Sequence, residues 1–172
     1  MDVHVGHMPS WQKARKVMKD RYLFRGKRID NGEWVQGFLS VHTFIPSEEE
    51  FEKSGKETYL APVIESVPER IYDHDVYEVD PSTICRCIGC RDKNGKLIWE
   101  NDIIDGSAKR GAAFSRCLVV RNECKARYDV RTKDCNFPMM LDGICGEISV
   151  SGLDYEVIGN GFDNPELLEV QE

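Results

Sequence analysis

The chain has 172 residues, 41% of them apolar and 31% charged, a size that suits one ordinary domain or two small ones. Its formal net charge of −7 and its pI near 5.2 argue against a general nucleic-acid binder, because such proteins present a basic surface. It contains no run of about 18 apolar residues and no secretory signal. We therefore expect a cytoplasmic protein without a membrane span.

A basic segment opens this acidic chain. Residues 9–21 contain five basic residues and one acidic residue, a net charge of +4, which leaves −11 for the rest. Ser10 suits a helix N-cap, and Trp11, Ala14 and Met18 fall on one face at helical spacing. We expect a short basic helix that docks on the chain's own acidic body or on a neighbouring copy. The alternative is a basic segment that binds an acidic partner, RNA or a membrane surface.

From Tyr22 onward, apolar residues alternate in short runs, as in β-strands. The Asp-Asn-Gly turn at residues 30–32 is a strong hairpin signal, because Asn and Gly tolerate the positive φ of a tight turn. A second hairpin is expected at residues 92–96, leading into a strand at 97–99. The two hairpins are similar when their Asn-Gly pairs are superposed, which suggests a duplicated hairpin.

A short helix is expected after Pro46, because Ser47 and Glu50 stand in capping-box register and Gly55 is a natural stop. Further short segments have strand character, and a helical turn begins near Pro165. The expected strands are 59–64, 76–79, 103–104, 117–120, 126–130 and 155–158.

Many short strands joined by turns predict a mainly β fold, either a small barrel or a sandwich of short antiparallel strands, with a short N-terminal helix. We divide the chain into three parts. Residues 1–20 are a basic helical N-terminal extension, residues 21–75 a β-hairpin region with a helical insertion, and residues 76–172 a barrel-like β module.

All seven cysteines lie between Cys85 and Cys145. Their odd number and the missing secretory signal favour free thiols in a reducing compartment over a disulfide framework. Cys85, Cys87 and Cys90 offer one zinc knuckle, but structural zinc needs about four ligands, usually from two knuckles, and no His follows His74. Cys85 and Cys87 would share one face of an extended strand, where buried thiols behave as small hydrophobes. We therefore expect core thiols and no metal.

Glu100, Asp102 and Asp105 are the best enzymatic candidates, because paired carboxylates hold magnesium or carry out acid–base chemistry. The structural alternative is a strand–turn–strand over residues 99–104. In that interpretation Asn101 takes the left-handed turn position, and the Asp102 carboxylate accepts hydrogen bonds from the turn backbone. We favour the structural interpretation.

His42 and His74 are the candidates for Cys–His catalysis, but no local context pairs either with a particular thiol. Asp73, His74 and Asp75 could ligate a metal, yet neighbouring side chains of a strand point to opposite faces. No phosphate-binding glycine loop and no G-x-S-x-G elbow occurs. We therefore predict a non-enzymatic protein with no catalytic, cofactor-binding or metal-binding residues.

Three blocks of the sequence follow one another in a specific order. The first is residues 24–37, the second comprises 77–84, Gly89, 92–96 and 100–104, and the third is 156–160 followed by 164–168. Over somewhat under half of the chain, these blocks resemble the YopX protein family, found in phages and prophages of bacteria.

The resemblance implies a β-rich fold whose second half is similar to SH3-like barrels, in a phage- or prophage-encoded protein of the bacterial cytoplasm. It supplies no reaction. Trp34 and Trp99 are motif positions, whereas the family usually has Gly, an aromatic and an aliphatic residue in place of Cys85, Cys87 and Cys90. The thiols are therefore no family motif.

The leading prediction is a protein that acts by self-association or by binding another phage or host protein, with no membrane and no small-molecule substrate as partner. One alternative is a metal-dependent protein, either a zinc module or a hydrolase that uses Glu100 and Asp102. Another is nucleic-acid binding through the basic segment together with Lys109, Arg110 and Arg116, which would weaken steeply with salt.

Overall fold

The structure is a computed structural model of the whole chain, and it describes residues 20–66, 75–105, 116–132, 139–140 and 155–169. The chain divides into two compact units. One is Leu23–Arg86, here called the ribbon unit; the other comprises Met1–Tyr22 and Cys87–Glu172 and is called the sheet unit.

Both units consist mainly of antiparallel strands, which confirms the predicted mainly β fold. The strands of the described ranges form open antiparallel sheets rather than a closed barrel. The predicted helical extension at residues 1–20 lies outside the described residues, apart from Asp20. No helix within the described ranges is both long and apolar enough to cross a bilayer.

The ribbon unit is a small antiparallel sheet in the order β4-β3-β2-β1-β5, of which the last strand continues into the sheet unit. An isolated bridge between Arg28 and Val79 joins the end of β1 to the end of β4. The elements are β1 (Phe24–Lys27), β2 (Trp34–Phe44), α2 (Glu48–Ser54), β3 (Tyr59–Ser66), β4 (Val76–Glu78), the 3-10 turn η1 (Pro81–Thr83) and β5 (Cys85–Arg91).

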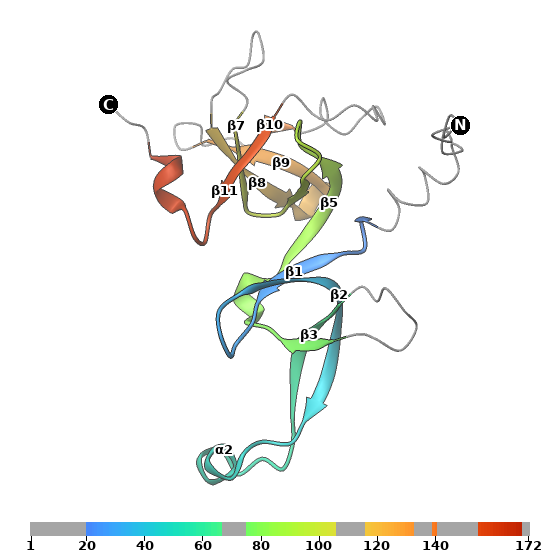
Figure 1. Cartoon of the computed structure of the whole chain (residues 1–172), viewed down its shortest axis with the longest axis vertical. Coiled ribbons are helices and arrows are strands. Elements are labelled where there is room, and N and C mark those ends of the chain that lie inside the picture. The colour runs from blue at the N-terminus through green and yellow to red at the C-terminus, as the bar shows by residue number, and fades with distance from the viewer. Residues whose placement is uncertain (1–19, 67–74, 106–115, 133–138, 141–154, 170–172) are drawn as a thin grey trace, which may run out of the picture. The chain divides into compact units, whose positions relative to one another are not determined.

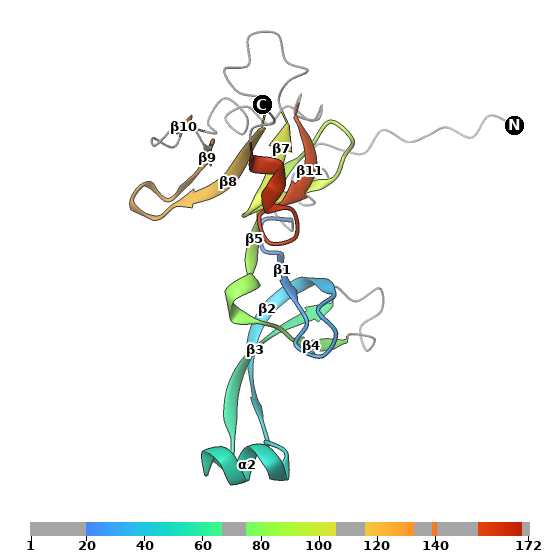
Figure 2. The same cartoon turned by 90° about the vertical axis from the view of Figure 1, so that its left-hand side faces the viewer.

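The predicted first hairpin is present, and it joins β1 to β2. The Arg28 N–H donates to the Glu33 carbonyl over 2.9 Å, and Gly32 takes a φ of 73°, which costs little without a Cβ. β2 and β3 then run side by side to α2, as Figures 1 and 2 both show. The paired segment reaches from Gly37 and Ser66 to Phe44 and Tyr59.

The predicted capping box at the start of α2 is confirmed. The Ser47 hydroxyl accepts from the Glu50 N–H, and the Glu50 carboxylate accepts from the Ser47 N–H over 2.9 Å. Gly55 ends the helix with a φ of 65°. The helix buries none of its residues, so capping and local pairs rather than packing hold it together.

The core of the ribbon unit depends on one close backbone approach. A Cβ at Gly37 would lie 1.9 Å from the Glu65 carbonyl oxygen, so β2 and β3 can pair at this point only because residue 37 has no side chain. Val63, Ile64 and Val79 are fully buried nearby. This core fixes the root of the β2–β3 ribbon.

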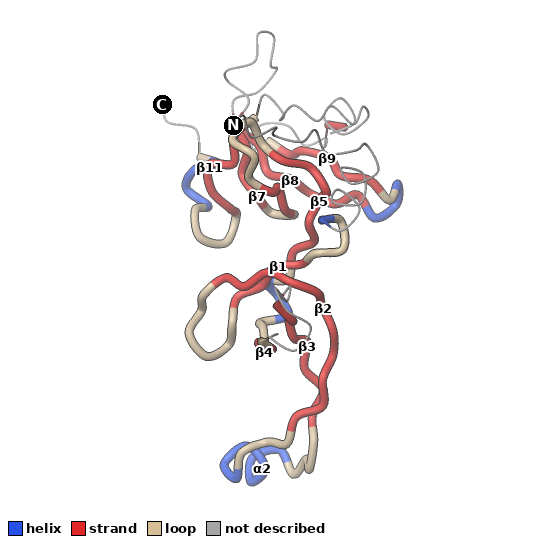
Figure 3. The backbone as a smooth tube through the Cα atoms, turned by 45° about the vertical axis from the view of Figure 1, so that its right-hand side comes forward, coloured by secondary structure: helices blue, strands red, loops and turns tan. Residues whose placement is uncertain are grey.

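The sheet unit is built on a five-stranded antiparallel sheet in the order β10-β9-β8-β7-β11, drawn in red in Figure 3. The end of β5 pairs with β6 beside it. The elements are β6 (Leu97–Trp99), β7 (Asp102–Asp105), β8 (Arg116–Asn122), the 3-10 turn η2 (Glu123–Lys125), β9 (Arg127–Arg131), β10 (Met139–Met140), β11 (Glu156–Asn160) and the 3-10 turn η3 (Pro165–Leu168).

Apolar side chains of these strands meet in one buried cluster. It contains Ile88, Ile98, Ile104, Cys117, Val119, Val130, Tyr155 and Val157. Burying each large aliphatic side chain contributes about 1.5–3 kcal/mol, so this cluster is the main stabilising feature of the unit. The strands that the sequence predicted after residue 96 all occur, with ends displaced by one or two residues, and so does the helical turn at Pro165.

Candidate functional site

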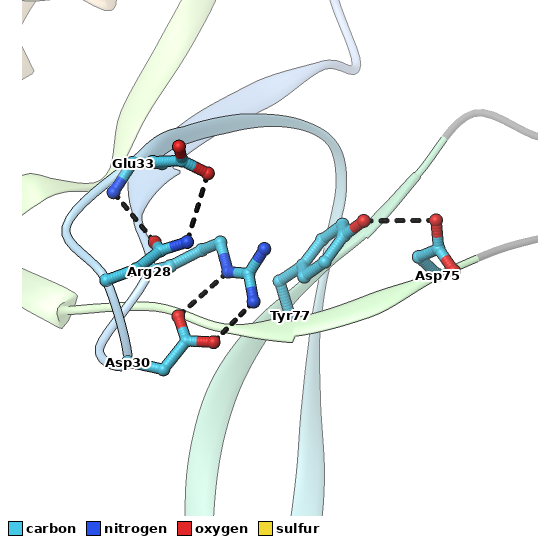
Figure 4. Close-up of polar contacts among 6 residues, drawn as sticks. Arg28, Asp30, Glu33, Asp75 and Tyr77 are labelled. Atoms are coloured by element: carbon cyan, nitrogen blue, oxygen red, sulfur yellow. Dashed lines mark hydrogen bonds and ion pairs between the residues drawn. The ribbon is translucent and has the colours of Figure 1, made fainter.

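The turn between β1 and β2 carries a chain of polar contacts, shown in Figure 4. The Arg28 Nε donates to Asp30 Oδ1 over 2.8 Å, and a second bond joins Arg28 Nη2 to Asp30 Oδ2. The hydrogen bonds from Arg28 lower the pKa of Asp30. The Arg28 guanidinium also stacks on Tyr77, with 4.5 Å from Cζ to the ring centroid, and the Tyr77 hydroxyl donates to Asp75.

Of the predicted Asp73, His74 and Asp75 cluster, only Asp75 lies within the described residues. Its carboxylate accepts from the Tyr77 hydroxyl over 3.0 Å, and this bond raises the pKa of Tyr77. Asp75 therefore belongs to the contacts that fasten β4 to the β1–β2 turn.

Aromatic side chains around β1 are covered by cations. Arg25 Cζ lies 4.8 Å and Lys27 Nζ 5.5 Å from the Trp34 ring centroid, and Arg86 Cζ lies 5.2 Å from that of Phe24. Such contacts stabilise by about 0.5–1 kcal/mol each at exposed sites. The family-motif residue Trp34 thus has an architectural role in its hairpin, and sequence reasoning had not found these pairs.

Three of the described thiols are buried, as expected for core residues: Cys85, Cys87 and Cys117. Burial raises the pKa of Cys87 to about 11 and that of Cys117 to about 12. Cys124 is an exposed free thiol. Cys90 is disulfide-bonded, which corrects the expectation of free thiols at that position.

The Cys85, Cys87 and Cys90 run therefore does not present three free thiolates for a metal. Over the described ranges, no group of three or more His, Cys, Asp or Glu side chains is placed to hold a metal ion.

The predicted structural role of Asp102 is confirmed. Its side chain is fully buried, and its Oδ2 accepts from the Trp99 N–H over 2.9 Å. Asn101 takes the predicted left-handed conformation with a φ of 62°. Asp105, three residues further along β7, falls on the opposite strand face from Asp102. The structure therefore uses Asp102 to close the turn between β6 and β7.

Two other buried carboxylates hold turns in the sheet unit. Asp92 Oδ1 accepts from the Asn94 and Lys96 N–H groups, each over 2.8 Å. Asp129 accepts from Asn122 Nδ2 over 2.8 Å and from Arg127 Nε over 2.9 Å. The sequence predicted the turn at residues 92–96, but it did not predict that either carboxylate is buried. For Asp92, the Asp-x-Asn spacing of the turn was the available signal.

Ser40, His42 and Glu65 meet on one face of the ribbon. The Ser40 hydroxyl donates to Glu65 Oε1 over 2.6 Å, and His42 Nε2 lies 3.2 Å from the same oxygen. In a catalytic triad the imidazole stands between hydroxyl and carboxylate, whereas here the carboxylate stands between the other two. The three side chains therefore do not have the order of a catalytic triad.

Several large apolar side chains that are exposed belong to the paired part of β2 and β3 or to the connection through α2, and α2 lies at the far end of this ribbon (Figure 1). Val41 and Thr43 pair across the ribbon with Pro62 and Leu60, so Val41 and Leu60 share one face. They are 63% and 72% exposed. We call the following set the ribbon tip: Val41, Ile45 (85% exposed), Phe51 on α2 (47%) and Leu60.

An exposed apolar set of this kind is typical of a contact surface, because monomeric proteins seldom leave clustered large apolar residues in water. The opposite face of the ribbon differs. There the Phe44 and Tyr59 rings stack with centroids 5.6 Å apart and are half-buried. The ribbon tip was not predicted from the sequence.

The basic residues proposed for nucleic-acid binding are only partly described. The Arg116 guanidinium donates from Nη1 to the Leu167 carbonyl over 3.4 Å, a contact within the sheet unit. Lys109 and Arg110 lie outside the described residues.

The comparisons with known proteins give a family and a structure. A family model described as YopX protein matches residues 11–169. A solved structure, that of protein EF1440 from Enterococcus faecalis, is similar with 23% identity and a TM-score of 0.43 over 85% of this chain and 96% of that one. No curated protein matches the chain.

Proposed function

The chain belongs to the YopX protein family, and we propose that it is a non-enzymatic protein that self-associates through the ribbon tip. The observation that carries this proposal is the cross-strand neighbourhood of Val41 and Leu60, both exposed by more than half on one face. Covering these side chains removes apolar area from water, which favours association by roughly 25 cal/mol per Å².

The polar residues that sequence reasoning had considered for catalysis support a non-enzymatic role. Asp102 is used in a turn, and His42 lies beside Glu65 and Ser40, two residues the sequence had not singled out, in an order that is not that of a catalytic triad. The proposal also takes the protein to be phage- or prophage-encoded and to work in the cytoplasm of the bacterial host, as the family resemblance implies.

Light scattering on the full chain tests the proposal. We expect an apparent mass above the 19.7 kDa of one chain, rising with concentration. The double variant V41T/L60T should shift this equilibrium towards the monomer by about tenfold or more, because Thr retains β-propensity but loses the apolar contact. Exposed positions tolerate such changes within about 0.5 kcal/mol of folding stability.

The matched control is I29T, since Ile29 is 58% exposed in the β1–β2 turn but lies outside the ribbon tip. It should leave the mass unchanged. A wild-type mass of one chain at all concentrations would overturn the proposal, and so would an equal effect of I29T and V41T/L60T.

A further inference from the structure

The segment that carries most of the ribbon tip is acidic. Residues 45–60 contain five acidic and two basic residues, a net charge of −3. Building on the proposed self-association, we infer that the ribbon tip binds the basic segment at residues 9–21 of a second copy of this chain.

The acidic side chains of α2 are not all engaged within their own unit. Glu49 pairs with Lys53 over 2.7 Å, and Glu50 is bonded to Ser47 in the capping box. Among the described residues, Glu48 and Glu52 have no ion-pair partner. Each can therefore form an ion pair with a basic side chain of another chain without losing an existing ion pair.

These unengaged acids flank an apolar side chain. Residues three and four apart lie on one side of a helix, so Glu48, Phe51 and Glu52 form one stripe along α2. Glu57, on the way to β3, adds a third exposed acid without a partner among the described residues. The ribbon tip thus presents apolar side chains bordered by negative charge.

The segment at residues 9–21 has the complementary pattern in its sequence. Trp11, Ala14 and Met18 recur at helical spacing, and five basic residues surround them: Lys13, Arg15, Lys16, Lys19 and Arg21. Its net charge of +4 opposes the −3 of residues 45–60. Apolar contact with Trp11 would supply affinity, and the opposed charges would select the orientation and speed the encounter.

The end of the segment is fastened to the sheet unit. Asp20 Oδ2 accepts from Arg91 Nη2 over 2.7 Å. Gly89, with a φ of 79°, leaves room for Arg21, whose Cγ would lie 2.3 Å from a Cβ at residue 89. In the inferred dimer, the basic segment of each copy, held at its end by its own sheet unit, binds the ribbon tip of the other copy. The two contacts are then identical and related by a two-fold axis.

A charge-exchange experiment on the full chain tests this inference. One variant reverses the segment (K13E/R15E/K16E) and another reverses the tip (E48K/E52K/E57K). Each alone should weaken association by about tenfold or more at about 50 mM salt, and the loss should shrink at about 500 mM salt. An equimolar mixture of the two should recover association to within about threefold of the wild type, because opposite charges then meet again.

The control for net charge is E123K/E166K/E169K, which makes the same total change in charge as the tip variant E48K/E52K/E57K, at exposed positions of the sheet unit. It should leave the mass distribution near that of the wild type. Circular dichroism checks that every variant is folded.

The outcomes separate this inference from the proposed function. If V41T/L60T lowers the mass but the segment reversal does not, the tip has another occupant: the inference fails and the self-association stands. Failure of the mixture to recover association also overturns it, as does loss of the complex on nuclease treatment, which would point to a nucleic-acid bridge. A monomeric wild type overturns both.

Discussion

The Asp92 carboxylate accepts a hydrogen bond from the Val157 N–H over 3.1 Å, between residues that are 65 positions apart in the sequence. Its other oxygen accepts from the Asn94 and Lys96 N–H groups of its own turn. One buried side chain thus holds the β5–β6 hairpin and fastens β11 to it.

The substitution D92N should lower the free energy of unfolding by about 2–3 kcal/mol, because it removes a charged acceptor and places an amide where three N–H groups converge. Urea unfolding followed by circular dichroism measures the loss. The control E156Q removes an exposed pair with Lys93 and should cost less than about 1 kcal/mol. Equal losses for the two variants would contradict the assigned role of Asp92.

Replacing Ala126 by glycine should stabilise the protein, whereas glycine destabilises most positions. The φ of 49° at Ala126 lies in the left-handed region at the end of η2, where a Cβ costs about 1 kcal/mol. We expect A126G to raise the free energy of unfolding by up to about 1 kcal/mol and A126V to lower it by at least as much. Thermal unfolding of the pair measures both changes, and a destabilising A126G would show that the residue is not held in this conformation.

The buried thiols should resist alkylation in the folded chain. The thiolate is the reactive species, and burial keeps Cys87 and Cys117 protonated up to pKa values of about 11 and about 12. At a pH of about 8, iodoacetamide should modify Cys124 well before either of them. Mass spectrometry of peptides measures the order, and fast labelling of Cys117 without denaturant would refute it.

The same two thiols make a contribution to the free energy of unfolding that decreases at alkaline pH. Their folded pKa values lie above the ordinary value of 9.0, so the folded state binds their protons more tightly than the unfolded state. The contribution is therefore complete below pH 9.0 and is lost as the pH rises through about 11 and about 12. The variant C117A should reduce this alkaline decline.

Asp30 should titrate below its ordinary pKa of 3.8, because the Arg28 guanidinium hydrogen-bonds its carboxylate. A lowered pKa means that the contribution of this pair to stability is present above the unfolded pKa and disappears as the pH falls through the folded value. NMR titration of R28M should return Asp30 to its ordinary range. The exposed cation variant K53M should leave it unchanged, and an unaltered pKa in R28M would contradict the pairing.

Local signals in the sequence were sufficient for most elements of the fold. The turn at Gly32, the cap at Ser47 and the left-handed Asn101 depend on residues close in sequence, so their geometry follows from residue type. The structural role of Asp102 was predictable for the same reason.

Long-range contacts were not predictable in this way. Nothing near Asp92 in the sequence indicates Val157, and the stacking of Arg28 on Tyr77 joins the β1–β2 turn to β4, which are far apart in the sequence. The ribbon tip was missed because strand alternation in β2 puts apolar residues on both faces, and the pattern alone does not say which face is covered.

The outer part of the ribbon has a consequence for its dynamics. Beyond the pairing of His42 with Ala61, the backbones of β2 and β3 pair only with each other within the described sheet, and one side-chain hydrogen bond joins Tyr59 to Glu78 of β4. A two-stranded ribbon is marginally stable by itself, so its amide hydrogens should exchange with solvent through local openings that leave the core closed. Occupation of the ribbon tip by a partner would slow that exchange, and hydrogen–deuterium exchange would then locate the bound surface without any substitution.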